Sequence, residues 1–467
     1  MTESYDLAVI GSGPGGYVAG IRAAQQGLKT AVIEKDRLGG VCLNWGCIPT
    51  KALLRDAELF ESFQDAAAHG FSLGKVGFDA AKIVARSRQV ADKMNRGVAA
   101  LFKKYKVTHI AGTAKLLGAG RVQVTGAAGE AATVQAKDLL IATGARPRAL
   151  AGYPVDGHTV ITYRHALELT QFPKRLLIVG AGAIGVEFAY YFSTFGVEVT
   201  LVEMLPQLLP SEDEEIAAAL LRAFRKRGVR CHPGTTVKAF KAQPGRVEAI
   251  LSAAAGGGAD TPEVWDVALL AVGMEANTEH LGLEAAGVAL ERGFIRTDGR
   301  MRTTAEHVYA IGDVAGRQLL AHKASAEAEA AVGAIAGHAH PALDYGRIPA
   351  CTYCRPQVAS IGLTEQQCKA QGLKYRVGRF PYAASGKANA IEHTEGLVKL
   401  IFGEPHGQVL GAHLIGAEAT ELIAELGLAM RLEATHEEIL ATIHAHPTLS
   451  EMVFEATGVA FGSSANL

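Results

Sequence analysis

The chain has 467 residues, of which 49% are apolar and 20% are charged, and at about 150 residues per domain this length predicts about three folded domains. The 46 Lys and Arg residues nearly balance the 47 Asp and Glu residues, which argues against nucleic acid or a membrane surface as a partner. Six cysteines are too few for a disulfide scaffold. The first six residues lack the features of a signal peptide, and no apolar run approaches the about 18 residues that span a bilayer, so we expect a cytoplasmic protein.

The first predicted element is a strand over residues 7–10, which leads into a glycine turn, a helix and a second strand that ends at Glu34. The same pattern starts again at Leu176 and ends at Glu203, at an offset of 169 residues. The glycines of the two turns are Gly11, Gly13 and Gly16 in the first copy, and Gly180, Gly182 and Gly185 in the second.

In a dinucleotide-binding unit such glycines form the tight turn, let a pyrophosphate approach the helix N-terminus, and let the helix pack closely on the strand. The acid that ends the second strand binds ribose hydroxyls. A plain strand-to-helix turn is the alternative for one copy, but two copies with the same terminal acid favour two bound dinucleotides.

The remaining predicted elements follow in chain order. Residues 52–105 are mostly helical with a glycine-rich break at 70–77, residues 107–140 alternate as strands, and residues 253–258 form a hairpin tip. An apolar strand leads to Asp313, and beyond Pro349 we expect strands, an amphipathic helix near residues 417–431 and a short helix opened by Pro447.

Two cysteines, Cys42 and Cys47, follow the first dinucleotide-binding pattern with four residues between them, which is not the two-residue spacing of a zinc knuckle. Pro49 suits the first turn of a helix, which would place Cys47 at a helix N-terminus where the dipole stabilises a thiolate. Two unrelated buried thiols are the alternative, but their position beside a dinucleotide site favours a redox pair. We predict no metal site.

Residues 39–54 resemble the redox-active disulfide motif of the dihydrolipoamide dehydrogenases, within the glutathione reductase superfamily, and other motifs of that family follow in order along essentially the whole chain. The resemblance implies FAD in the first dinucleotide unit and NAD in the second. It implies that Cys42 exchanges with the substrate and that Cys47 faces the flavin as a charge-transfer thiolate.

The same resemblance assigns further residues to the cofactors. Lys51 is expected to pair with Glu187 beside the flavin, Ile184 to lie where the nicotinamide docks, and Asp313 to bind the ribityl or pyrophosphate region of FAD. Gly144 and Gly273 complete the expected cofactor-binding set.

Near the C-terminus, His446 and Glu451 resemble the family's His-Glu motif. Because His446 precedes Pro447, we expect it at a helix cap, with Glu451 orienting the ring and favouring its protonated form. Such a base is needed because the thiolate is the nucleophile in thiol–disulfide exchange. The role of His444 is open between packing and a supporting hydrogen bond.

The pattern argues against related reductases. Residues 199–210 contain no Lys or Arg to hold the 2′-phosphate of NADP, and acids follow at 212–215. The last cysteine is Cys368, so the extra C-terminal redox pair of mercuric and large thioredoxin reductases is absent.

Two segments depart from the family pattern. Residues 273–278 lack the family's basic residues, which puts the usual nucleotide contacts there in doubt. Residues 353–357 create a spacing of two residues between Cys351 and Cys354. Because residues three apart on a strand point to opposite faces, we interpret both as ordinary thiols.

We therefore predict an α/β fold with two Rossmann-like domains and a C-terminal α+β dimerisation domain. The expected boundaries are 1–147 for the FAD domain, 148–276 for the NAD domain, 277–347 for a central domain that completes the FAD site, and 348–467 for the interface domain.

The resemblance implies a homodimeric enzyme that oxidises dihydrolipoamide with NAD. Its expected partners are the lipoyl domains and acyltransferase core of a 2-oxo acid dehydrogenase complex, or a glycine cleavage carrier protein. The alternatives are a related NADH-dependent disulfide or quinone reductase and a flavoprotein assembly subunit.

Overall fold

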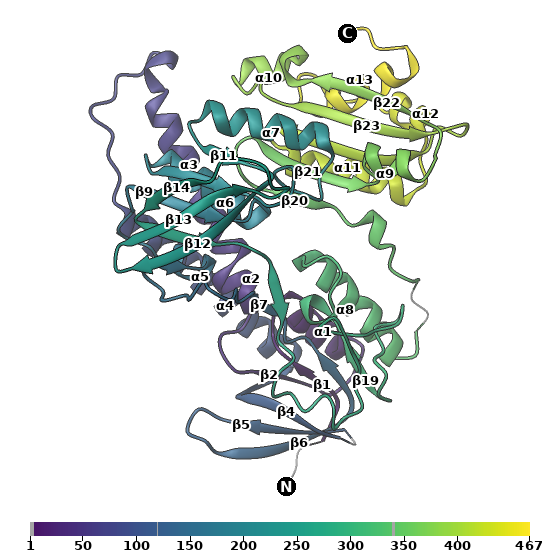
Figure 1. The fold of residues 1–467 in the computed structure, drawn as a ribbon. Coiled ribbons are helices and arrows are strands. Elements are labelled where there is room, and N and C mark those ends of the chain that lie inside the picture. Colours follow the sequence, from purple (N-terminus) through teal and green to yellow (C-terminus); the bar gives the residue numbers. More distant parts are fainter. Residues whose placement is uncertain (1–3, 119, 339–340) are drawn as a thin grey trace. The chain divides into compact units, whose positions relative to one another are not determined.

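The computed structural model describes residues 4–118, 120–338 and 341–467, and the chain forms two compact units (Figure 1). The first unit comprises Met1–Leu53, Ala81–Arg148 and Gly273–Leu343, and the second comprises Leu54–Ala80, Ala149–Val272 and Asp344–Leu467. Each unit is α/β and is described by itself. The finer division into four domains stays a prediction.

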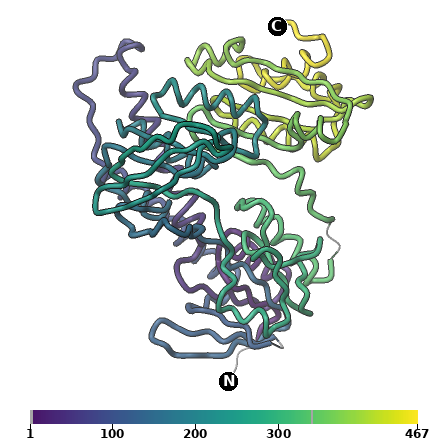
Figure 2. Tube along the Cα trace, viewed as in Figure 1, coloured from purple at the N-terminus to yellow at the C-terminus, as the bar shows by residue number. Residues whose placement is uncertain are grey.

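The first unit is built on a seven-stranded sheet in the order β3-β2-β1-β6-β5-β4, with β19 also paired to β6. Its strands are β1 Ser4–Ile10, β2 Thr30–Glu34, β3 Thr108–Ala111, β4 Thr113–Gly118, β5 Arg121–Thr125, β6 Ala131–Ile141 and β19 Val308–Ala310. The pairings among β1, β2, β3, β6 and β19 are parallel, whereas β4 and β5 extend β6 as an antiparallel meander. Helices α1 Pro14–Gln25 and α8 Ala321–Ile335 pack on each other, although they lie far apart in the sequence (Figure 2).

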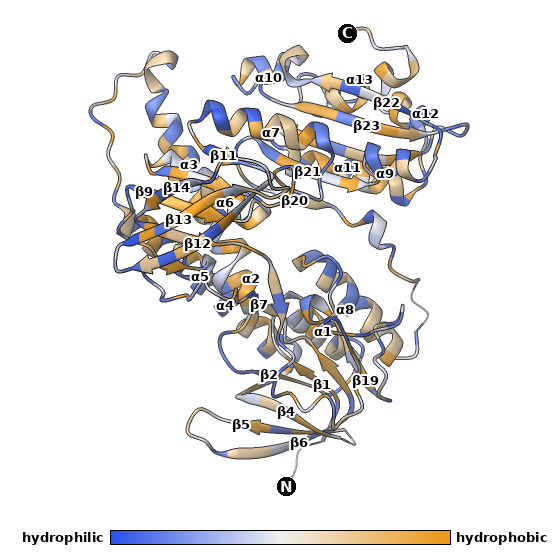
Figure 3. Ribbon diagram, in the orientation of Figure 1, coloured by the Kyte–Doolittle hydropathy of each residue, from blue (hydrophilic) through white to orange (hydrophobic). Residues whose placement is uncertain are grey.

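Both faces of the β1 strand are buried, which explains its almost continuous apolar sequence. Leu7 and Val9 join a cluster with residues of α1 and α8. Ala8 and Ile10 point to the opposite face and join a second cluster with Val122 of β5. The colouring in Figure 3 shows β1 as a hydrophobic strand inside the unit.

The first unit also contains further helices and short strands, and two of these helices carry the cysteine motif. The helices are α2 Gly40–Trp45, the start of α3 Cys47–Gln64 and most of α4 Ala80–Tyr105; the short strands are β7 Ala145–Pro147, β16 Met274–Ala276, β17 Leu290–Glu291 and β18 Phe294–Ile295. β7 pairs with β16 in an antiparallel ribbon.

The second unit holds a five-stranded parallel sheet in the order β11-β10-β9-β15-β8. Its elements are β8 Val160–Ile161, α5 Tyr163–Ala166, β9 Arg175–Val179, α6 Ala183–Thr194, β10 Glu198–Val202, α7 Glu214–Lys226, β11 Arg230–His232 and β15 Val267–Leu270. An antiparallel meander of β12 Thr235–Gln243, β13 Arg246–Ala253 and β14 Thr261–Trp265 packs against it.

The C-terminal part of the second unit is an antiparallel sheet in the order β20-β21-β24-β23-β22. Its strands are β20 Ala350–Thr352, β21 Gln357–Gly362, β22 Tyr375–Pro381, β23 Leu397–Gly403 and β24 Val409–Gly416, and its helices are α9 Glu365–Ala370, α10 Gly386–Ala390, α11 Ala419–Arg431, α12 His436–Ala441 and α13 Glu451–Phe461. Side chains of α11 and α13 join the strands in one apolar core.

A buried ion network links α7 to this antiparallel sheet. The ammonium of Lys399, on β23, is 2.8 Å from Asp213, 2.9 Å from Glu215 and 2.8 Å from Glu365. Lys399 is only 1% exposed, so its charge depends on these carboxylates for compensation. Next to the network, burial raises the pKa of Glu212 to about 7, although Ser360 donates a hydrogen bond to its carboxylate at 3.0 Å.

Several predicted elements are confirmed. The helical region with its break at 70–77, the strands between 107 and 140, the hairpin tip at 253–258 and the helix near 417–431 all form. No helix of the described residues is long and apolar enough to cross a bilayer.

Three local predictions were wrong. Pro447 does not open a helix and His446 does not lie at a helix cap, because α13 begins at Glu451 with Ser450 as its N-cap residue. Thr448 uses its N–H to bond Glu451 and its hydroxyl to bond Ala445, which holds residues 445–451 in a turn before the helix. Cys351 and Cys354 also do not share a strand, as the sequence analysis assumed. β20 ends at Thr352, so Cys351 lies on the strand but Cys354 follows it.

Candidate functional site

The two dinucleotide-binding patterns adopt the same backbone geometry. Gly11 and Gly180 have φ angles of 99° and 100°, which lie in the left-handed region that favours glycine. A side chain at Gly16 would collide with the carbonyl of Gly11, and one at Gly185 would collide with the carbonyl of Gly180. Each third glycine therefore allows a helix to start directly against its strand.

The middle glycine of each turn faces open space. A Cβ atom placed on Gly13 or Gly182 would meet no other atom within 4 Å, and these residues cap the N-termini of α1 and α6. An anion can therefore approach both helix N-termini closely, as a bound pyrophosphate requires. The residues present fit one dinucleotide in each unit.

The two terminal acids are held in the same way. Glu34 accepts hydrogen bonds from Ser12 N–H at 2.8 Å and from Asp36 N–H at 2.9 Å. Glu203 accepts them from Ala181 N–H at 2.8 Å and from Leu205 N–H at 2.9 Å. A carboxylate oxygen has two lone pairs, so each fixed acid keeps acceptor capacity for ribose hydroxyls.

A buried ion pair supports the turn that carries Asp313. The Lys323 ammonium, on α8, donates to the Gly312 carbonyl at 3.0 Å and lies 3.1 Å from Glu327, which accepts the Gly312 N–H at 2.7 Å. Both side chains are at most 1% exposed. Desolvation raises the pKa of Asp313, and the charge of Lys323 opposes that rise. The sequence analysis missed this pair, although Lys and Glu four residues apart in an Ala-rich helix were a signal.

The two motif cysteines lie beside each other in the first unit. Cys42 belongs to α2, and Cys47 is the first residue of α3, as its expected helix position requires. The hydrogen bond with Cys47, followed by burial, raises the pKa of the Cys42 thiol, and the positive charge of Lys51 opposes this rise. The negative charge of Cys47 also raises it. Tyr17, which the sequence analysis missed, lies close enough that the charge of Cys42 adds to burial in raising the tyrosine pKa.

The loop before the cysteines is fixed by asparagine side chains. Asn44 donates to the carbonyls of Leu38 and Gly40 at 2.9 and 3.0 Å, and Asn95 of α4 donates to the Leu38 carbonyl at 2.7 Å. These bonds hold the turn that leads into α2, and hence the position of Cys42.

Glu187 is buried on α6, one helical turn after Ile184. Its carboxylate accepts a hydrogen bond from the Tyr353 N–H at 2.9 Å, so the unusual segment 353–357 supports Glu187 through its backbone. Because Lys51 and Glu187 belong to different units, their pairing stays a prediction, as does the place of Ile184 beside the nicotinamide.

The other unusual segment, 273–278, contains its own charge compensation. Glu275 on β16 is 2.9 Å from Arg146 on the paired strand β7, and Arg146 also bonds Glu279 at 2.7 Å. Gly144 and Gly273, which precede the two strands, have φ angles of 70° and 99°. Arg146 of the neighbouring strand thus compensates the charge of Glu275.

The predicted acid–base pair is formed in the second unit. Nδ1 of His446 is 2.9 Å from Oε1 of Glu451, and the His446 side chain is 79% exposed. Desolvation opposes ionisation of Glu451, but bonds from the Thr448 N–H and from His446 lower its pKa overall. His444, whose role was open, has a side chain that is only 7% exposed and bonds Glu425 at 2.8 Å.

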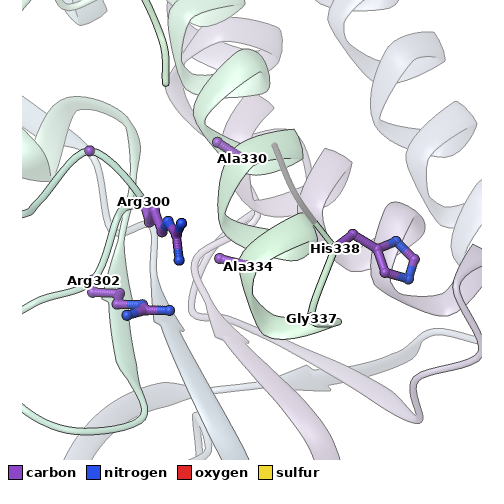
Figure 4. A pocket seen from close by; sticks show the side chains of 7 residues that line it. Arg300, Arg302, Ala330, Ala334, Gly337 and His338 are labelled. Carbon is purple, nitrogen blue, oxygen red and sulfur yellow. The ribbon is translucent and has the colours of Figure 1, made fainter. Parts of the chain in front are cut away.

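Neither a cavity nor a metal-binding cluster coincides with the predicted site residues in the described part of the chain. A pocket of about 280 Å³ lies between Arg300, Arg302 and the end of α8 (Figure 4), and none of the predicted site residues lines it. Within residues 4–118, 120–338 and 341–467, no group of three or more His, Cys, Asp or Glu side chains is arranged to hold a metal ion.

Comparisons with known proteins place these features in context. A family model described as pyridine nucleotide-disulphide oxidoreductase matches residues 5–328, and a model of the dimerisation domain of that family matches residues 348–457. A dihydrolipoyl dehydrogenase of Zymomonas mobilis is 48% identical over 99% of both chains, and one of Chlorobaculum tepidum is 50% identical over 98% of this chain and 97% of its own. The crystal structure of LpdA from Mycobacterium tuberculosis has a TM-score of 0.90 at 28% identity, and covers 97% of this chain and 98% of its own.

Proposed function

This chain belongs to the pyridine nucleotide-disulphide oxidoreductase family, and on that basis we propose that it is a dihydrolipoyl dehydrogenase that oxidises dihydrolipoamide to lipoamide and reduces NAD⁺ to NADH. The observation that carries the proposal is the cysteine pair. Cys42 and Cys47 contact each other at the start of α3, in the same unit as a dinucleotide cradle, with Lys51 close enough to favour thiolate. A dithiol substrate is the chemistry that such a pair can exchange with.

The chain's own residues account for the thiol chemistry. His446, oriented by Glu451, accepts a proton from one substrate thiol. The substrate thiolate attacks Sγ of Cys42 in the oxidised pair, so that a substrate–Cys42 bond forms, the Cys42–Cys47 bond breaks and Cys47 leaves as thiolate. The second substrate thiol then displaces Cys42 and releases lipoamide, and its proton passes to the departing Cys42 sulfur. The pair is left reduced by two electrons.

The cofactors complete the electron path. Gly11, Gly13 and Gly16 with Glu34 and Asp313 would hold FAD, and the matching glycines of α6 with Glu203 would hold NAD. FAD in that position supplies the two-electron chemistry between a dithiol and a nicotinamide. The overall reaction converts dihydrolipoamide and NAD⁺ into lipoamide, NADH and one proton.

The proposal extends to the assembly. The match to a dimerisation domain over residues 348–457 supports a homodimer, with His446 of one chain serving the cysteines of the other. The names of the relatives support lipoyl domains as partners, in a 2-oxo acid dehydrogenase complex or the glycine cleavage system. We place the enzyme in the cytoplasm.

A steady-state assay tests the function. Purified protein, yellow with FAD released on denaturation, should form NADH from dihydrolipoamide and NAD⁺. The Cys42→Ser and Cys47→Ser variants should both lack this activity. Turnover of another disulfide or of a quinone without turnover of dihydrolipoamide would favour a related reductase, and inactive protein that still binds an acyltransferase core would favour an assembly subunit.

A further inference from the structure

A half-buried carboxylate, Glu61, lies in the C-terminal half of the helix that begins at Cys47. Its side chain is 13% exposed and belongs to the second unit. The Glu61 carboxylate has four partners, which come from three other segments of the chain: the hydroxyls of Tyr190 and Thr194 and the guanidinium groups of Arg227 and Arg355.

The two oxygens of Glu61 divide these partners between them. Oε2 accepts from Arg355 at 3.0 Å and from the Tyr190 hydroxyl at 3.1 Å. Oε1 accepts from Arg227 and, at 3.3 Å, from Thr194. Charge-assisted bonds to guanidinium are the strong type of protein hydrogen bond, and such bonds act most strongly where water is excluded.

The side chains around Glu61 fit an ionised carboxylate. Burial, and then the negative charge of Glu61, raise the pKa of Tyr190, so its phenol remains a donor. Arg355 also donates to Nδ1 of His393 at 2.9 Å, and burial followed by the charge of Arg355 lowers the pKa of His393, which keeps the imidazole a neutral acceptor. Arg227 lies over the Tyr190 ring at 4.7 Å.

The segments joined at Glu61 matter for function. Tyr190 and Thr194 belong to α6, the helix that also carries Ile184 and Glu187. Arg355 lies two residues after Tyr353, whose N–H holds Glu187. It stands in the segment 353–357, which departs from the family pattern. Glu61 itself lies on α3, which is continuous from Cys47 to Gln64.

We propose that Glu61 is a positioning residue for electron transfer: it ties the helix that starts at Cys47 to α6, the helix proposed for the nicotinamide site, through Tyr190 and Thr194, while Arg227 and Arg355 balance its charge. The inference rests on the proposed function. Replacing Glu61 with Gln would remove the negative charge that Arg227 and Arg355 share and weaken their charge-assisted bonds, so the end of α3 would shift from its place against α6. Because an α-helix is stiff over a few turns, Cys47 would shift with it.

The test uses the purified full-length holoenzyme. In Glu61→Gln, the long-wavelength absorption of the Cys47 thiolate against the flavin should weaken and shift, and kcat with dihydrolipoamide should fall about tenfold, since small misplacements of reacting groups are costly. The KM for dihydrolipoamide should stay within about twofold, and so should NADH oxidation by an artificial acceptor, which bypasses the cysteines. Ser62→Ala is the matched control: Ser62 is the next residue on the same helix, it is exposed and its hydroxyl bonds the Glu58 carbonyl at 2.9 Å, so both readouts should stay as in the wild type.

The outcomes separate the two proposals. A folded, FAD-loaded Glu61→Gln protein with wild-type absorption and kcat would overturn the positioning role, even if its melting temperature fell, because Glu61 would then only stabilise the fold. If Glu61→Gln does not fold, Arg355→Gln takes its place, with a smaller change in the same band expected, and an unchanged band counts against the proposal. Wild-type protein without dihydrolipoamide activity would instead refute the proposed function, while the comparison of absorption bands would still decide the role of Glu61.

Discussion

Nδ1 of His446 and Oε1 of Glu451 lie 2.9 Å apart, so the carboxylate fixes which imidazole nitrogen is directed to solvent. If Nε2 of His446 is the base, His446→Gln should lower kcat with dihydrolipoamide by at least about 100-fold. Glu451→Gln should cost less, about tenfold, because the ring is kept but loses its orienting charge. If the wild type and both variants turned over dihydrolipoamide at the same rate, His446 and Glu451 would have no part in the mechanism. His444→Gln, which disturbs the neighbouring bond to Glu425, serves as the control.

The cysteines should have divided roles. Either Cys42→Ser or Cys47→Ser should abolish dihydrolipoamide turnover, while NADH oxidation by an artificial acceptor survives. Only the variant that retains Cys47 should show the long-wavelength thiolate–flavin band, because Cys47 is the sulfur that is expected to face the flavin. Bands of equal strength in both variants would mean that the two sulfurs are assigned wrongly.

If each active site is shared between two subunits, inactive variants should complement each other. Cys47→Ser and His446→Ala homodimers should both be nearly inactive, because every site lacks one group. After joint unfolding and refolding, a mixed dimer contains one site with the intact disulfide of one chain and the intact base of the other. Activity should therefore return. Proven mixed dimers without activity would indicate that His446 serves its own chain.

Glu203 should select NAD over NADP, because its carboxylate is fixed by two backbone N–H groups and would repel a 2′-phosphate. The next residue, Met204, is 61% exposed, so an Arg can be placed there without burying a charge. Glu203→Ser combined with Met204→Arg should raise kcat/KM for NADP at least about tenfold relative to NAD. Met204→Arg alone should change little. Wild-type protein that uses both nucleotides equally would contradict the assignment.

Glu212 should make stability depend on pH. Burial raises its pKa from the ordinary 4.5 to about 7, so between these values the folded protein keeps a proton that the unfolded chain has lost. The stabilising contribution is complete below pH 4.5 and is lost as pH rises through 7, and it amounts to about 3 kcal/mol. Relative to wild type, Glu212→Gln should therefore gain melting temperature between pH 5 and pH 8. For the exposed neighbour, Glu214→Gln, the difference in melting temperature from the wild type should stay constant over this pH range. A constant difference for Glu212→Gln as well would refute the titration of Glu212.

The sequence predicted the dinucleotide units well because their constraints are local. A left-handed φ at Gly11 and close packing at Gly16 leave few residues possible, and the same constraints recur at Gly180 and Gly185. The acid at the end of each second strand was predictable for the same reason.

The remaining interactions depend on side chains that meet only after folding. Arg146 meets Glu275 from a strand more than a hundred residues away, and Arg355 meets Glu61 across almost three hundred. At Pro447 a local signal was misleading. Proline suits a first helical turn, but it does not indicate whether a helix follows at once. The Thr448 and Glu451 bonds decided that point.

The buried ion network around Lys399 also determines how the protein would behave if its chain were cut into two fragments. Its acids Asp213 and Glu215 come from the nucleotide-binding segment, whereas Lys399 and Glu365 come from the segment beyond residue 348. A cut between the two segments would expose an ammonium group on one fragment and orphaned carboxylates on the other, each beside freshly uncovered apolar surface. Neither piece is then a self-sufficient module. Co-expressed halves should be recovered as a reassembled pair, so the nucleotide-binding segment and the C-terminal sheet are better regarded as one cooperative folding unit.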